Sequence, residues 1–152
     1  MKADRFALGP MPKLEVELDP VTLEIYWRRL ITVMDETDKT VVRTAFSTIV
    51  GESGDFACVL TDERGWGLAQ STFSTTLFTV TTPRTIRYML ETYPLETLED
   101  GDVLICNDPW IGAGHLPDVC VATPVFRNGK VVAFIGTVAH VPDIGGQPGY
   151  FN

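Results

Sequence analysis

Apolar side chains recur at every third or fourth position between residues 19 and 46, which is the spacing of one face of an α-helix. The recurring residues are Leu23, Trp27, Leu30, Met34, Val41 or Val42, and Ala45. Asp19 can cap the first turn, and Pro20 follows at the position where a missing amide hydrogen costs least. The pattern predicts one long amphipathic helix that runs to about Phe46, with its Trp and Met stripe in the core.

Strand patterns follow this helix. In "DFACVLTDERGWGLAQST", two short apolar runs flank the turn-like segment 62–65, which predicts a hairpin. Thr82 and Pro83 repeat the cap-then-proline start for a second helix, "PRTIRYMLETY", closed by Pro94. "GDVLICNDPW" predicts a buried strand that runs into a glycine-bearing loop. Together these patterns predict an α+β fold, with a long N-terminal amphipathic helix, a mixed or antiparallel sheet with hairpins, and one further helix.

The length of 152 residues is that of about one domain. The prolines near the start predict an extended N-terminal arm over residues 1–18, followed by the folded part over residues 19–152. The ending "DIGGQPGYFN" has the glycine and proline content of a connecting loop. We therefore expect residues 19–152 to be the N-terminal portion of a longer, truncated domain.

Composition narrows the class of protein. Hydrophobic residues make up 45% and charged residues 21% of the chain, as in an ordinary globular protein. The net charge is -8 and no basic run interleaves with aromatics, so we expect no nucleic-acid partner. No segment has the length and hydrophobicity of a membrane span or a signal peptide, so we expect no membrane association and a cytoplasmic location. Cys58, Cys106 and Cys120 are predicted to be buried small hydrophobic residues.

The two histidines of the chain stand in the same pattern, in which an apolar residue, a proline and an aspartate follow each histidine. The two segments are residues 115–118 and residues 140–143. Between them lie two runs rich in β-branched residues, joined by Asn128 and Gly129, a strong signal for a hairpin turn. A hairpin would bring both histidines and both aspartates to one open end.

The register of this hairpin has two predicted forms. A two-residue turn sets His140 opposite Pro117, whereas a three-residue loop with a bulge at Gly129 sets it opposite Leu116. Side chains alternate between the faces of a strand, so only the second register places Asp118 and His140 on the same face.

Two imidazoles with two or more carboxylates are nitrogen and oxygen ligands suited to zinc, manganese or ferrous iron. The alternative for each histidine segment is a surface turn closed by its aspartate. Two acidic positions compete to complete the set: Asp55, where a loop enters a strand, and Asp108, where a strand leaves into a loop. Each could instead close an Asx turn on its own backbone, and local features favour neither.

Several motifs carry a family resemblance. "DPVTLEIYWRRL", "RTAFSTIVGESGDFACVLTDERGWGLAQ", "GDVLICNDPWIGAGHLPDVCVATPVF" and "AHVPDIGG", in this order and spacing, resemble the N-terminal part of the hydantoinase B/oxoprolinase family. That family includes B subunits of ATP-dependent hydantoinases and lactamases, the matching half of 5-oxoprolinase, and metal-bearing subunits of acetone and acetophenone carboxylases. Two departures are Val141, where many members have a second histidine, and "STFSTTLFTVTTP", which replaces a stretch that contains a histidine.

The resemblance implies a site for one divalent transition metal, either zinc or manganese or else iron. The implied ligands are Asp55, His115, Asp118 and His140. Other residues are implied to support the metal ligands or to form a substrate loop, and these are Asp108, Asp143, Gly112, Gly114, Gly145 and Gly146.

The resemblance also implies partners and a reaction. In the family, an A-type subunit binds ATP and phosphorylates a carbonyl or lactam oxygen. The metal-bearing B-type subunit, which this chain resembles, then completes hydrolysis or carboxylation. The leading expectation is the ATP-dependent opening of a cyclic amide, such as a hydantoin, a lactam or 5-oxoproline. Carboxylation of a small ketone is the alternative within the family. An alternative of another class is a truncated, inactive module for binding or assembly.

Overall fold

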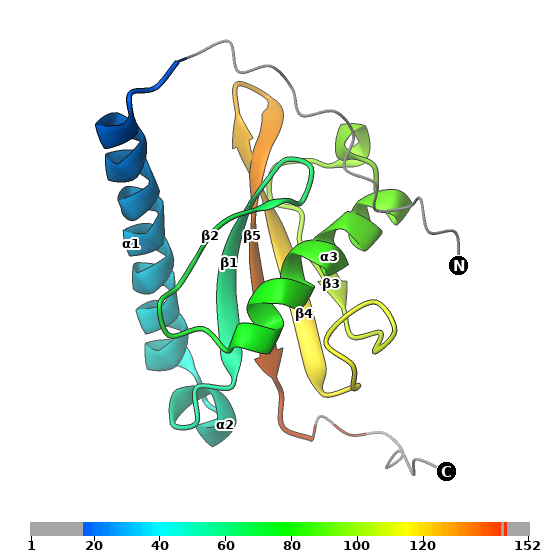
Figure 1. Ribbon diagram of the computed structural model, residues 1–152. Coiled ribbons are helices and arrows are strands. Elements are labelled where there is room, and N and C mark those ends of the chain that lie inside the picture. Colours follow the sequence, from blue (N-terminus) through cyan, green and yellow to red (C-terminus); the bar gives the residue numbers. More distant parts are fainter. Residues whose placement is uncertain (1–16, 144, 146–152) are drawn as a thin grey trace.

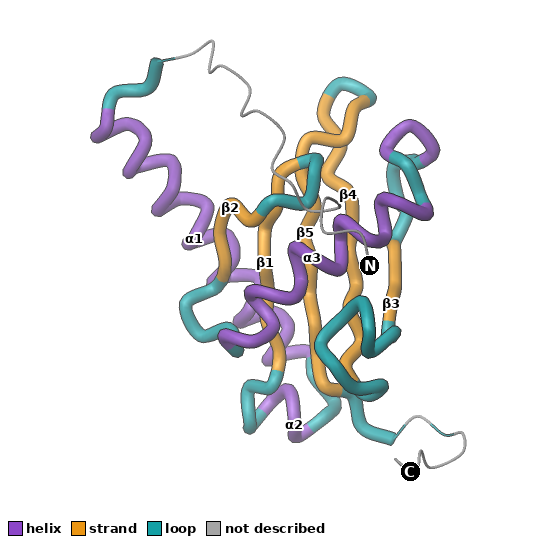
Figure 2. The backbone as a smooth tube through the Cα atoms, turned by 45° about the vertical axis from the view of Figure 1, so that its right-hand side comes forward, coloured by secondary structure: helices purple, strands orange, loops and turns teal. Residues whose placement is uncertain are grey.

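The structure is a computed structural model that describes residues 17–143 and 145 (Figures 1 and 2). The predicted arm falls on residues outside this part except for its last two positions, and Gly146 also lies outside it. The elements in chain order are α1 (Pro20–Thr44), α2 (Thr48–Gly51), β1 (Phe56–Asp62), β2 (Gly67–Gln70), α3 (Thr76–Thr92), the 3-10 helix η2 (Leu95–Thr97), β3 (Leu104–Cys106), β4 (Asp118–Arg127) and β5 (Lys130–His140).

The five strands form one antiparallel sheet in the order β2-β1-β5-β4-β3. Helix α3 covers one face, where Phe78, Ile86 and Met89 pack with Phe134 of β5. Helix α1 covers the other face, where Met34 packs against β1 and β2 (Figure 1). The predicted α+β fold is confirmed. None of the helices in the described part of the chain is long and apolar enough to cross a membrane.

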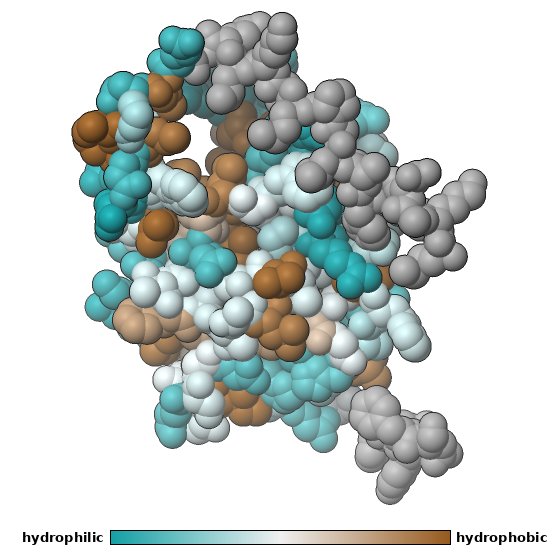
Figure 3. Space-filling view, in the orientation of Figure 1, coloured by the Kyte–Doolittle hydropathy of each residue, from teal (hydrophilic) through white to brown (hydrophobic). Residues whose placement is uncertain are grey.

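Helix α1 begins as predicted and is less buried than predicted. The Asp19 carboxylate accepts hydrogen bonds from the N–H groups of Val21 and Thr22. Met34 is fully buried, but Trp27 is 52% exposed, since the N-terminal turns diverge from the sheet (Figure 2). Apolar residues consequently reach the surface over the upper part of α1 in Figure 3. The prediction of a wholly buried Trp and Met stripe was wrong for these turns.

Helix α3 begins at Thr76, seven residues before the predicted first residue Pro83, with Thr75 in place of Thr82 as its N-cap, and Pro83 lies inside it. The β-branched run "TLFTVTT" hid this helix, because such residues have a low intrinsic helix propensity. Burial of Phe78, Thr82 and Ile86 against the sheet outweighs that preference. The Thr82 hydroxyl also donates to the Phe78 carbonyl at 2.5 Å, so the buried polar group is satisfied within the helix.

Strand β3 differs from the buried strand that was predicted. It is the edge strand beyond β4, and Ile105 is 70% exposed while Leu104 is buried. The cysteine prediction is confirmed for Cys58 and Cys120, which are buried free thiols, whereas Cys106 is partly exposed on the edge strand. The short helices α2 and η2 were not predicted, because neither is long enough to show a helical repeat.

The β4–β5 hairpin has the predicted two-residue turn at Asn128 and Gly129, both of which have positive φ angles. The ladder then gains one extra residue in β5, because Phe126 pairs with Val131 and Val125 with Ala133. This bulge sets His140 directly opposite Asp118. Both predicted registers were therefore wrong by one or two residues.

Candidate metal centre

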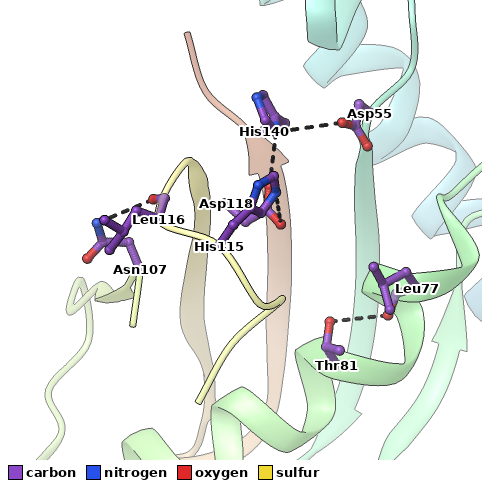
Figure 4. Close-up of polar contacts among 8 residues, drawn as sticks. All are labelled: Asp55, Leu77, Thr81, Asn107, His115, Leu116, Asp118 and His140. Carbon is purple, nitrogen blue, oxygen red and sulfur yellow. Dashed lines mark hydrogen bonds and ion pairs between the residues drawn. The ribbon is translucent and has the colours of Figure 1, made fainter. Parts of the chain in front are cut away.

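The two histidine segments meet at one end of the central strands. Strand β4 begins at Asp118 and β5 ends at His140, and the two residues are paired across the ladder. Directly opposed residues of an antiparallel pair share a face of the sheet. His115 lies three residues before Asp118, on the loop that leads into β4, and its side chain turns back onto that aspartate (Figure 4). The ladder and the loop together bring three candidate ligands to one place.

Asp118 is the centre of this cluster. Its Oδ2 lies 2.7 Å from Nε2 of His115, and its Oδ1 lies 3.2 Å from Nδ1 of His140. One ligand atom from each of these three residues lies within 4.8 Å of the other two. The two imidazole rings are tilted by 51° with centroids 5.0 Å apart, so their nitrogens converge on the carboxylate. The donor atoms are thus close enough to share one ion.

The Asp118 carboxylate is 1% exposed, yet neither oxygen has a partner with hydrogen-bond geometry. The imidazole nitrogens approach it at short range without the directionality of a hydrogen bond. A buried carboxylate in this state is costly unless a cation compensates its charge. Two imidazole nitrogens and a carboxylate form the donor set that binds zinc, manganese or ferrous iron, so the residues present fit such an ion.

Asp55 lies beside the cluster rather than within it. Its Oδ2 is 3.9 Å from Nδ1 of His140, and its side chain is 39% exposed. Its backbone carbonyl accepts a hydrogen bond from the His140 N–H at 3.1 Å, which extends the β1–β5 ladder by one pair. Asp55 therefore lies beside the cluster, immediately before β1, with its carboxylate facing His140 (Figure 4).

Asp108 has a local role in the structure. Its Oδ1 accepts the Trp110 N–H at 2.9 Å, and its carbonyl accepts the Gly112 N–H at 2.8 Å. A β-carbon at Gly112 would lie 3.2 Å from this carbonyl, which leaves little room for any other residue. Asp108 closes an Asx turn at the start of the loop that carries His115. Of the two competing carboxylates, the structure brings Asp55 next to a histidine of the cluster.

The other residues of the predicted substrate loop are only partly described. The Oδ1 of Asp143 accepts the Gly145 N–H at 2.9 Å, so this aspartate also closes a turn. Gly114 has a φ of 107°, a conformation that a side chain disfavours, immediately before His115. Gly146 lies outside the described residues. The local geometry supports a loop role for Asp143 and Gly114 and adds no ligand.

Sequence reasoning missed the residues that hold the His115 loop. The Asn107 side-chain amide donates to the Leu116 carbonyl at 3.5 Å, which joins the two ends of the loop. The Thr85 hydroxyl of α3 contacts the Ile111 carbonyl at 3.3 Å and joins the loop to the helix. Asn107 could have been suspected from its place between a strand and the turn at Asp108, but Thr85 carries no local signal.

The chain matches the pattern of the Hydantoinase B/oxoprolinase family over residues 19–152. It is 37% identical over 141 residues to the B-type component of a putative D-/L-hydantoinase from Pseudomonas sp. (strain NS671), with 89% of this chain and 24% of that protein covered.

Two solved structures share the fold. One is the ATP-dependent caprolactamase from Pseudomonas jessenii, with a TM-score of 0.76 and 25% identity over 86% of this chain and 22% of that one. The other is nucleotide-free acetone carboxylase, with a TM-score of 0.72 and 28% identity over 81% of this chain and 16% of that one.

The chain therefore spans about a quarter or less of the length of these proteins. The family match covers nearly the whole of it, and the fold agrees with both solved structures. This chain belongs to the hydantoinase B/oxoprolinase family.

Proposed function

We propose that this chain forms the metal-binding part of a hydantoinase B-type subunit, which acts with an ATP-binding A-type subunit to hydrolyse a cyclic amide. The observation that carries the proposal is the convergence of His115, Asp118 and His140, with both oxygens of the buried carboxylate lacking hydrogen bonds. Two related proteins also support the proposal, the putative hydantoinase and the ATP-dependent caprolactamase, because their names refer to cyclic amides.

In this proposal His115, Asp118 and His140 hold the ion, and Asp55 completes the set from β1. A metal held there supplies a Lewis acid that polarises a carbonyl and lowers the pKa of a bound water to about 7. Asp118 is placed by its pairing with His140 in the ladder, and His140 by its backbone bond to Asp55, so both ligands would be held by the sheet itself. Asp108 and Asn107 hold the loop that presents His115.

A second reaction, the carboxylation of a small ketone, is favoured by the structural likeness to acetone carboxylase. The same residues would serve both reactions, because a metal held by them would polarise a carbonyl oxygen in either case. The two reactions differ in what they consume, since only carboxylation requires bicarbonate.

The test combines the chain with its A-type partner, ATP and either a panel of hydantoins and lactams or acetone with bicarbonate. We expect ATP-dependent ring opening and about one equivalent of transition metal by elemental analysis. His115→Ala and His140→Ala should lose both metal and turnover. Asp102→Asn serves as the matched control, because Asp102 accepts the Glu99 N–H in a turn before β3 and an asparagine keeps that acceptor.

Equal metal content in the wild type and both histidine variants would refute the metal site. Turnover of acetone with bicarbonate, without ring opening of any amide, would replace hydrolysis by carboxylation. A metal-loaded chain that supports neither reaction with its partner would support the assembly-module alternative.

A further inference from the structure

A loop with its own polar network lies next to Asp55. Residues 71–75 connect β2 to α3, and we call them the STFST loop. Ser71 is 1% exposed, and its hydroxyl donates to Oδ2 of Asp38 at 2.7 Å. Asp38 lies on α1 and is itself buried. The loop is therefore attached to a charged group in the layer on one side of the sheet.

The direction of the hydrogen bonds in this network follows from its acceptor. The single proton of the Ser71 hydroxyl goes to the Asp38 carboxylate, so in the 2.5 Å contact between the Ser71 and Ser74 hydroxyls Ser74 must be the donor. The Ser74 oxygen in turn accepts the Cys58 N–H at 3.0 Å. A chain of bonds from β1 to a carboxylate, all in one direction, polarises each member and rigidifies the loop.

The last residue of the loop, Thr75, binds both neighbours of Asp55. Its N–H donates to the Phe56 carbonyl at 3.0 Å, and its hydroxyl donates to the Gly54 carbonyl at 3.2 Å. On the other edge of the same segment, the Asp55 carbonyl accepts the His140 N–H. The peptide groups around Asp55 are thus bound by the loop and by β5. They are also bound locally, because the Asp55 N–H donates to the Ile49 carbonyl at 3.2 Å and the Gly54 carbonyl also accepts the Phe56 N–H at 2.9 Å.

We infer that Thr75 is a positioning residue for the carboxylate of Asp55. The inference rests on the proposed function, because it assumes that Asp55 contributes to the metal centre. Asp55 lies at the rim of the cluster with a partly exposed side chain, so its approach to the ion depends on where its backbone is held. The Thr75 hydroxyl binds that backbone on the side away from His140, and the Asp38 network binds Ser71 and Ser74, the second of which adjoins Thr75.

The hydroxyl of Thr75 makes no hydrogen bond to the backbone of α3. Thr75 is the N-cap of that helix, but its side chain makes no capping hydrogen bond. Its bond to Gly54 reaches across 21 residues of sequence instead. Replacing Thr75 with valine keeps the shape and the backbone N–H and removes only this bond.

The experiment measures zinc affinity of the full 152-residue chain by isothermal titration calorimetry, with melting temperature recorded in parallel. Thr75→Val should weaken zinc binding about tenfold, the lower end for loss of a group that orients a ligand. Thr75→Ser keeps the hydroxyl and should bind within about twofold of the wild type.

Thr81→Val is the matched control. Thr81 lies in α3, the helix that Thr75 precedes, is also partly buried, and donates to the Leu77 carbonyl at 3.2 Å, the same distance as the bond under test (Figure 4). It should leave zinc affinity within about twofold, and its melting temperature shows the effect of removing a threonine hydroxyl far from the candidate metal centre. This control separates an effect on the metal centre from a general loss of stability.

A double-mutant cycle with Asp55→Ala gives the decisive result. His115, Asp118 and His140 remain in that variant, and three protein ligands hold zinc in catalytic sites, so binding stays measurable. In this background Thr75→Val should change the affinity by no more than about twofold, because the carboxylate that it positions is gone.

The inference is overturned if Thr75→Val binds like the wild type, or if its tenfold loss persists without Asp55. Either result leaves the proposed function intact. A wild-type chain that binds none of zinc, manganese and ferrous iron overturns both the inference and the metal site of the proposed function.

Discussion

The replacement of Asp118 by asparagine should change stability in opposite directions without and with metal. Asp118 is 1% exposed, and its two carboxylate oxygens lack partners with hydrogen-bond geometry. Asparagine has nearly the same shape and no charge. Without metal, the substitution therefore removes a buried charge that the protein compensates poorly, and it leaves the pairing of Asp118 with His140 in the ladder unchanged.

The size of each effect can be estimated. A buried polar group that lacks a hydrogen bond costs about 1–3 kcal/mol, and a charged one costs more, so the neutral amide should recover about 1–2 kcal/mol in the metal-free protein. For a chain of this length, each kcal/mol changes the melting temperature by about 2–4 °C. Zinc at a hundred times its Kd stabilises the wild type by about 2.7 kcal/mol, and Asp118→Asn should lose most of that gain.

The assay is thermal unfolding of the wild type, Asp118→Asn and Asp102→Asn at pH 8, with a chelator and with excess zinc. Asp118→Asn should melt above the wild type in chelator by at least about 2 °C and below it in zinc. Asp102→Asn should follow the wild type in both. If Asp118→Asn melts lower by the same amount in both conditions, the carboxylate has a structural role and the reasoning is wrong.

Three further predictions concern the rest of the fold. Burial raises the pKa of Cys58 and Cys120 to about 12, so a thiol reagent at pH 8 should label Cys106 first, as peptide mapping would show. Gly136→Ala should lower stability by about 1–3 kcal/mol in denaturant titration, because the new β-carbon would lie 2.6 Å from a methyl group of α3. Asp19→Ala should lower the melting temperature at neutral pH, and the difference should shrink as acid protonates this carboxylate.

The direction in which pH changes the stability contributed by Asp19 follows from the hydrogen bonds of its carboxylate. Those from Thr22, first from its side chain and then from its backbone, keep the pKa of the carboxyl below its usual value, so its stabilisation is present at neutral pH and is lost as the pH falls through that lowered pKa. A constant difference in melting temperature between pH 7 and pH 2 would contradict this account. Rapid labelling of Cys120 in the folded protein, or a Gly136→Ala variant as stable as the wild type, would likewise contradict the packing described for β4 and β5.

Elements with a strong local signal could be predicted from the sequence. The cap at Asp19 and the turn at Asn128 and Gly129 depend on residues a few positions apart, and both formed as predicted. The early start of α3 could not be predicted, because it depends on burying Phe78 and Ile86 against strands that lie far away in sequence. The same limit explains Thr75, whose hydroxyl bond to Gly54 spans 21 residues.

The geometry of the candidate metal centre could not be predicted from local sequence signals alone. The repeated histidine pattern identified His115 and His140, and the hairpin signal predicted that they meet. The turn alone would set His140 opposite Pro117, and the alternation of side chains would then send His140 and Asp118 to opposite faces of the sheet. The extra residue at Val132 shifts the ladder and restores a common face, although it lies eight positions, or about 26 Å of strand, from His140.

The residues around Val132 give no sequence signal for this bulge, because Val131 and Ala133 on either side of it fit a regular strand equally well. Its position follows instead from the face that β5 must bury. Phe134 and Val138, on the face shared with His140, pack under α3, and Gly136 between them admits the helix at close range. Cys120 and Ala122 of β4 are buried in the same cluster, and only the shifted ladder puts them on that face beside Val138 and Gly136. The common burial of β4 and β5 under α3 therefore agrees with this register, and the register brings the candidate ligands together. The repeated histidine pattern draws attention to His115, Asp118 and His140 as candidate ligands, whereas their geometry depends on the core of the whole sheet.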